Sequence, residues 1–140
     1  MDVGFKEALI FVFEECLKNP GYNLALNGDL GAGKTYFISH LIKKIDPVLS
    51  KEVSSPSFSF CNSYITESVQ IDHFDLYRLE EEEQLDEIGL FESLDNPKIL
   101  TLVEWAGMFR GLNRFFNGHL TLSESGTIRN YHIENMNHGR

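Results

Sequence analysis

The chain has 140 residues, 42% of them hydrophobic and 24% charged, and a formal net charge of −9, which is typical of one folded domain with a sizeable core. No apolar run reaches the roughly 18 residues of a membrane span, and the first residues lack the basic start and cleavage site of a signal peptide, so we expect a cytoplasmic protein without a membrane segment. Twelve acids and two bases in residues 67–104 argue against independent nucleic-acid binding, because phosphate contacts need clustered Lys and Arg.

The first predicted element is a helix that ends at Pro20-Gly21, with Asp2 as a candidate N-cap. Five apolar residues recur at helical spacing and form its buried face: Phe5, Ala8, Leu9, Val12 and Cys16. Cys16 and Cys61 both lie in apolar patterns, which favours reduced core residues over a disulfide.

The stretch GDLGAGKT, Gly28 to Thr35, fits the phosphate-binding P-loop pattern G-x-x-x-x-G-K-[ST]. Glycines let backbone N–H groups wrap around a phosphate chain, Lys34 adds a positive charge, and the Thr35 hydroxyl suits Mg²⁺. The apolar run Leu24 to Leu26 predicts a buried strand before the loop, and the spacing of apolar residues predicts a helix after it that ends at Asp46-Pro47. We therefore predict that a nucleotide is bound by Asp29, Leu30, Gly31, Ala32, Gly33, Lys34, Thr35 and Tyr36.

Residues 58–74 next predict a β-hairpin that turns at Thr66-Glu67-Ser68. Ser57, in the loop before it, is either a hydroxyl switch residue for Mg²⁺ or γ-phosphate, or an ordinary serine at a strand start. In HFDLYR, Asp75 could orient or deprotonate an attacking water or bind a water on Mg²⁺, whereas Arg78 could neutralise phosphate charge or pair with an acid. His73 is interpreted as a packed residue rather than a base.

The run Glu80–Glu83 is either a solvated helix start or a docking face for a basic partner, and one or two short helices interrupted at Gly89 follow it. The apolar run KILTLVEW predicts a buried strand that delivers Glu104 as a Walker-B acid, a Mg²⁺ partner. Residues 119–134 predict a second hairpin around Ser125-Gly126, and the last residues predict a frayed tail.

Four motifs in this order, NGDLGAGKTYF, SPSFSFCNSY, HFDLYRLE and LVEWAG, resemble those of the TsaE (YjeE) family, bacterial ATPases of transfer-RNA threonylcarbamoyladenosine synthesis. The motifs span Gly28 to Gly107. The usual SPTF of the family is Ser55-Pro56-Ser57-Phe58 here, and Glu7 stands about where the family often has a Thr near the adenine.

The resemblance implies one α/β domain over residues 1–140, a P-loop NTPase core with a mixed sheet, added antiparallel hairpins and helices on both faces. It implies that ATP and Mg²⁺ are the cofactors, that Thr35 and Glu104 hold Mg²⁺, and that Lys34, Ser57, Asp75 and Trp105 support weak, partner-dependent hydrolysis. It also implies TsaB and TsaD as partners, with hydrolysis resetting their complex between turnovers and transfer RNA reached only through that complex.

Two alternatives stay open at this point. A GTPase switch would need a guanine motif of the N/T-K-x-D type, which the sequence lacks. A small-molecule kinase would need an acceptor pocket and a basic lid, for which the segment around Arg110 and Arg114 is the candidate.

Overall fold

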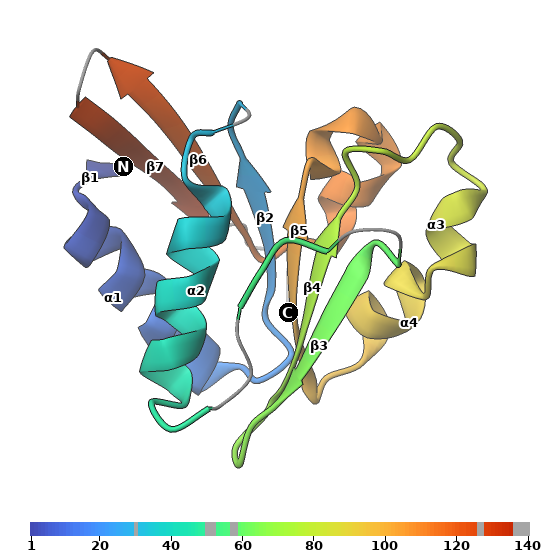
Figure 1. Cartoon of the computed structure of the whole chain (residues 1–140), viewed down its shortest axis with the longest axis horizontal. Helices are drawn as coiled ribbons and strands as arrows, with labels where there is room; N and C mark the ends of the chain where they lie inside the picture. The colour runs from blue at the N-terminus through green and yellow to red at the C-terminus, as the bar shows by residue number, and fades with distance from the viewer. Residues whose placement is uncertain (30, 50–52, 57–58, 126–127, 136–140) are drawn as a thin grey trace.

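The computed structural model describes residues 1–29, 31–49, 53–56, 59–125 and 128–135, and over these residues a seven-stranded sheet runs through the molecule in the order β1-β7-β6-β2-β5-β4-β3 (Figure 1). The strands are β1 (Asp2–Val3), β2 (Asn23–Asn27), β3 (Cys61–Ile65), β4 (Gln70–Asp75), β5 (Ile99–Glu104), β6 (Gly118–Ser125) and β7 (Ile128–Asn135). The α-helices are α1 (Phe5–Lys18), α2 (Lys34–Ile45), α3 (Gln84–Glu87) and α4 (Leu90–Asp95), and two 3₁₀ helices are η1 (Ala106–Met108) and η2 (Arg110–Phe115).

Strand direction divides the sheet into a parallel centre and two antiparallel hairpins. β2 pairs in parallel with both β5 and β6, and β4 pairs in parallel with β5. β3 is antiparallel to β4, and β7 is antiparallel to β6. The mixed sheet with added hairpins is therefore confirmed.

Both faces of the sheet are covered, so the central strands are buried on both sides. Leu24 and Leu26 of β2 belong to the core under α1 and α2, with Phe37 as one of its largest side chains. Ala25, which points to the other face, belongs to the core under α3, α4 and the 3₁₀ helices. Figure 1 shows α1 and α2 on one side of the sheet and α3 and α4 on the other. None of the helices within the described ranges has the length and apolar character needed to cross a membrane.

Several local predictions are confirmed. α2 ends with Asp46 at its C-cap, and Gly89 adopts φ +81° between α3 and α4. Among the described residues neither Cys16 nor Cys61 forms a disulfide, and burial raises the pKa of Cys16 to about 12. Residues 136–140 and the turn residue Gly126 lie outside the described residues.

Three predicted boundaries are wrong. Asp2 does not cap α1, because it pairs with His132 as part of β1 and Gly4 takes the N-cap position. The first hairpin begins at Cys61, after Phe60, whose φ of +61° interrupts extended structure. Glu80–Glu83 precede α3 instead of forming its first turn, and the Gln84 side chain accepts hydrogen bonds from the amides of Glu80 and Glu81.

Asn23, the buried first residue of β2, joins three elements of the fold. Its side-chain amide donates to the carbonyls of Leu94 in α4 and Phe115 in η2, each at 2.9 Å. Its backbone N–H donates to the side chain of Asn117 at 2.8 Å. These bonds fix the helical layer of one face against the strand that leads into the P-loop.

We expect Asn23→Ala to lower the free energy of unfolding by about 2–3 kcal/mol, because the carbonyls of Leu94, which is buried, and of Phe115, which is partly buried, lose their donor. Chemical denaturation followed by circular dichroism measures the change. Asn113→Ala, at an exposed position of η2, is the control and should be nearly neutral. Equal stability of the two variants would contradict a structural role of the Asn23 side chain.

Candidate phosphate-binding site

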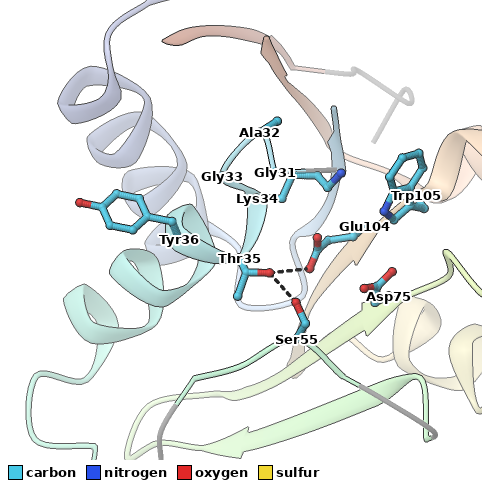
Figure 2. A pocket seen from close by; sticks show the side chains of 10 residues that line it. All are labelled: Gly31, Ala32, Gly33, Lys34, Thr35, Tyr36, Ser55, Asp75, Glu104 and Trp105. Atoms are coloured by element: carbon cyan, nitrogen blue, oxygen red, sulfur yellow. Dashed lines mark hydrogen bonds between the residues drawn. The ribbon is translucent and has the colours of Figure 1, made fainter. Parts of the chain in front are cut away.

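The candidate site lies where the parallel strands β2, β4 and β5 end. The register aligns Asp75 at the end of β4 with Glu104 at the end of β5, and Glu104 with Leu26 of β2, so the loop after β2 and both acids meet at one edge. A cavity of about 250 Å³ lies there, and Figure 2 shows the side chains around it. Its lining consists of residues 31–36, Ser55, Asp75, Glu104 and Trp105.

The P-loop backbone adopts conformations that require glycine. Gly28, Gly31 and Gly33 have φ values of +151°, +79° and +98°. A Cβ on Gly28 would also lie 2.7 Å from the carbonyl oxygen of Leu122. Gly33 is the N-cap of α2, so the unpaired N–H groups of the first helical turn are available to an anion. This geometry confirms the strand–loop–helix arrangement predicted around the motif.

Lys34 is buried at the base of the loop. Its ammonium group donates to the carbonyl of Gly28 and, at 3.3 Å, to that of Asp29, and it lies 4.0 Å from the centre of the Trp105 ring. Burial lowers the pKa of Lys34, while the nearby carboxylates of Glu104, Asp75 and Asp29 oppose that shift. The cation is thus held in place next to the loop that would surround a phosphate.

Glu104 has its carboxylate buried between two hydrogen-bonding side chains. His73 Nε2 lies 2.6 Å from Glu104 Oε2, and the Thr35 hydroxyl donates to the same oxygen at 3.5 Å. Thr35 Oγ1 is also 2.6 Å from the hydroxyl of Ser55 (Figure 2). His73 is fully buried, and its Nδ1 has no hydrogen-bond partner among the described residues. The imidazole of His73 therefore donates a hydrogen bond from its Nε2–H to the Glu104 carboxylate.

The oxygen atoms gathered here match the preferences of Mg²⁺. This ion binds through one or two protein oxygens and completes its shell with waters and phosphate oxygens. The hydroxyl of Thr35 and the carboxylate of Glu104 supply two such oxygens side by side. Within the described ranges, no group of three His, Cys, Asp or Glu side chains converges on one point, so a cation here would need ligands from phosphate and water.

Asp75 borders the same cavity from β4. Its carboxylate accepts a hydrogen bond from the backbone N–H of Tyr77 at 3.0 Å. Burial raises the pKa of Asp75, and the charge of Glu104 adds to the shift, whereas the Tyr77 amide, His73 and the charge of Lys34 oppose it. A carboxylate that is partly desolvated and close to the phosphate loop is suited to accept a proton from water.

The remaining predicted site residues are placed as follows. Asp29 borders two adjoining cavities rather than the central one. Tyr36 lines the central cavity with its ring half-exposed, 4.3 Å from the ring of His40. Leu30 and Ser57 lie outside the described residues, so their roles stay predictions.

Two residues of the site escaped the sequence analysis. His73, interpreted there as a packed residue, is packed but also binds Glu104. The sequence pattern that could have revealed this role is the alternation along β4, which puts His73 on the same strand face as Asp75. Ser55, two residues before the predicted Ser57, borders the cavity and bonds to Thr35.

Comparison with known proteins identifies relatives along most of the chain. The family described as "Threonylcarbamoyl adenosine biosynthesis protein TsaE" matches residues 6–131. A Rickettsia felis protein named tRNA threonylcarbamoyladenosine biosynthesis protein TsaE is 39% identical over 93 residues, which cover 66% of this chain and 53% of the relative. The protein of the same name from Rickettsia bellii is 40% identical over 93 residues, 66% of this chain and 62% of the relative. The match thus spans less than two thirds of the length of either relative.

A Bacillus subtilis protein of the same name is 37% identical over 87 residues, 62% of this chain and 52% of the relative. Among solved structures, the crystal structure of Bacillus subtilis YdiB matches with a TM-score of 0.64 and 23% identity, covering 94% of this chain and 82% of that chain. This structural likeness confirms the predicted α/β fold.

The contact between His73 and Glu104 leads to a stability prediction. His73→Phe should lower the free energy of unfolding by about 2–3 kcal/mol, because a buried carboxylate loses a donor. A double-mutant cycle with Glu104→Gln, followed by chemical denaturation, should give a coupling of about 1–3 kcal/mol. His40→Phe, at an exposed position of α2, is the control. Additive effects of His73→Phe and Glu104→Gln would show that the two side chains do not depend on each other.

Proposed function

This chain belongs to the TsaE family of threonylcarbamoyl adenosine biosynthesis proteins, and from this premise we propose that it binds ATP with Mg²⁺ and hydrolyses it in support of that transfer-RNA modification. The observation that carries the proposal is the meeting of Lys34, Thr35 and Glu104 at the end of a glycine loop. This is the arrangement that a nucleoside triphosphate and a magnesium ion require.

In the proposed complex, the loop N–H groups and Lys34 bind the phosphate chain, and Thr35 and Glu104 hold Mg²⁺. When bound, the metal ion would neutralise charge on the β- and γ-phosphate oxygens. Trp105 keeps the Lys34 ammonium in position through its ring face. Ser55 orients the Thr35 hydroxyl, and Ser57 remains a candidate switch residue.

Hydrolysis needs an oriented water on the far side of the γ-phosphate. We assign this role to Asp75, whose carboxylate borders the cavity together with Glu104. The water oxygen bonds to the γ-phosphorus, the bond to the β–γ bridging oxygen breaks, and Asp75 receives a proton from the water. ADP and inorganic phosphate are the products.

The nucleotide state is proposed to act on a complex of TsaB and TsaD, with transfer RNA reached only through these partners. The exposed run Glu80–Glu83 begins five residues after Asp75, the last residue of β4, so a basic surface docked on it would also approach the catalytic edge. Binding energies of nucleotide and partner are then coupled, and each should strengthen the other.

Lys34→Ala should weaken ATP binding about ten- to hundredfold, because it removes a charge-assisted contact of roughly 1.5–3 kcal/mol. Calorimetric titration with Mg-ATP measures the affinity. Lys98→Ala, at an exposed position before the amino end of β5 and far from the loop, is a control with the same charge change. Unchanged affinity in Lys34→Ala would remove the P-loop assignment.

Asp75→Asn should keep ATP affinity within a few-fold and lose most turnover, because the amide still accepts the Tyr77 hydrogen bond but takes up no proton. Turnover of the wild-type chain should be slow alone and rise at least tenfold with TsaB and TsaD, as when a partner completes an NTPase site. Phosphate release, measured with and without the partners across a salt series, tests both statements. Fast ATP hydrolysis by the isolated chain that does not change when TsaB and TsaD are added would contradict the proposed switch.

A further inference from the structure

Arg129 lies beside the P-loop although it belongs to a distant part of the sequence. It sits on β7 directly opposite Glu124 on β6, and its Nε donates to Glu124 Oε1 at 3.2 Å. The two side chains are 43% and 46% exposed, and an ion pair so open to water contributes little to folding stability. Stability gained from this ion pair therefore does not by itself account for the guanidinium of Arg129 next to the loop.

The guanidinium rests against the residue that opens α2. A Cβ built on Gly33 would lie 2.8 Å from Arg129 Nη1 and 3.4 Å from its Cζ. Gly33 has a left-handed backbone, and the helix that follows begins with Lys34. The charge of Arg129 also acts on the neighbouring Tyr131, where it opposes the increase in pKa that burial causes. The Arg129 guanidinium therefore lies next to the P-loop as well as next to Glu124 of the β6–β7 hairpin.

Lys34 and Arg129 approach the loop from different sides. The Lys34 ammonium lies against Trp105, which follows β5 (Figure 2), whereas Arg129 extends from β7, on the other side of β2 in the sheet. Glu124 borders a second cavity of about 340 Å³ with Gly28, Asp29, Ala32 and residues 121–123. The carboxylate that binds Arg129 therefore lies next to the outer wall of the same loop.

We propose that Arg129 is a second positively charged binding residue of the ATP site, in addition to Lys34. When nucleotide binds, the Arg129 guanidinium leaves Glu124 and binds the phosphate chain from the β7 side. The inference rests on the proposed function and adds a binding residue to it. A guanidinium offers a planar fork of N–H donors that matches phosphate oxygens, and a polyphosphate carries more negative charge than a single carboxylate. In the absence of nucleotide, the ion pair with Glu124 would then hold the Arg129 side chain near the P-loop.

The test measures the affinity for Mg-ATP and for tripolyphosphate, a phosphate chain without a nucleoside. Arg129→Gln should weaken both about ten- to hundredfold, and Arg129→Lys should retain part of the affinity, because it keeps the charge and loses the fork. Lys98→Gln, which changes the net charge equally at the opposite end of the sheet, should bind as wild type. Glu124→Gln should bind Mg-ATP at least as tightly as wild type, because the competing carboxylate is gone.

Three outcomes would overturn the inference. One is wild-type affinity in Arg129→Gln, and another is a loss confined to ATP that leaves tripolyphosphate unaffected, which would assign Arg129 to the nucleoside. The third is a loss in Glu124→Gln as large as in Arg129→Gln, which would make the ion pair a structural support of the loop. Thermal unfolding of each variant verifies the fold, and Arg129→Lys keeps the test decisive if Arg129→Gln is unstable. If the wild-type chain itself binds no ATP, the proposed function fails, whereas the outcomes above leave it standing.

Discussion

A buried carboxylate at the end of β5 sets the conditions for the rest of the site. Glu104 is removed from water, so it needs donors, and these come from His73 on β4 and Thr35 on α2. Those two contacts join the end of β5 to β4 and to α2. The hydrogen bonds to this one carboxylate thus connect the end of β5 with β4 and with the first turn of α2.

The chain carries a net charge of −9, yet its candidate site is built to receive an anion. Backbone N–H groups of the glycine loop and the α2 N-terminus provide partial positive charge that does not appear in a count of side chains. Lys34 and Arg129 add full charges on either side of that loop. The loop thus offers an anion backbone dipoles and two cations, although the chain as a whole carries an excess of acids.

The sequence predicted those parts of the structure that depend on neighbouring residues in the chain. The P-loop and the α2 helix were evident because glycine positions and helical spacing are local signals, and Glu104 was evident because it ends an apolar run. His73 was missed as a site residue because its partner lies on another strand, 31 residues away. Asp2 was interpreted as a helix cap because its actual partner, His132, lies on β7, a pairing that no local pattern reveals.

The order of the strands has a consequence for how the chain is made. β2, which leads into the P-loop, lies between β5 and β6, so both of its neighbours are synthesised after it, the second of them only at Gly118–Ser125. Until β5 is synthesised, β2 has no neighbouring strand at either edge, and until β6 follows, one edge of β2 stays unpaired. Pairing across such long separations is slow and exposes the strand to association with other chains. The loop after β2 therefore acquires its support late in synthesis, and a chain that ends before β6 is a fragment in which β2 lacks one of its two neighbours.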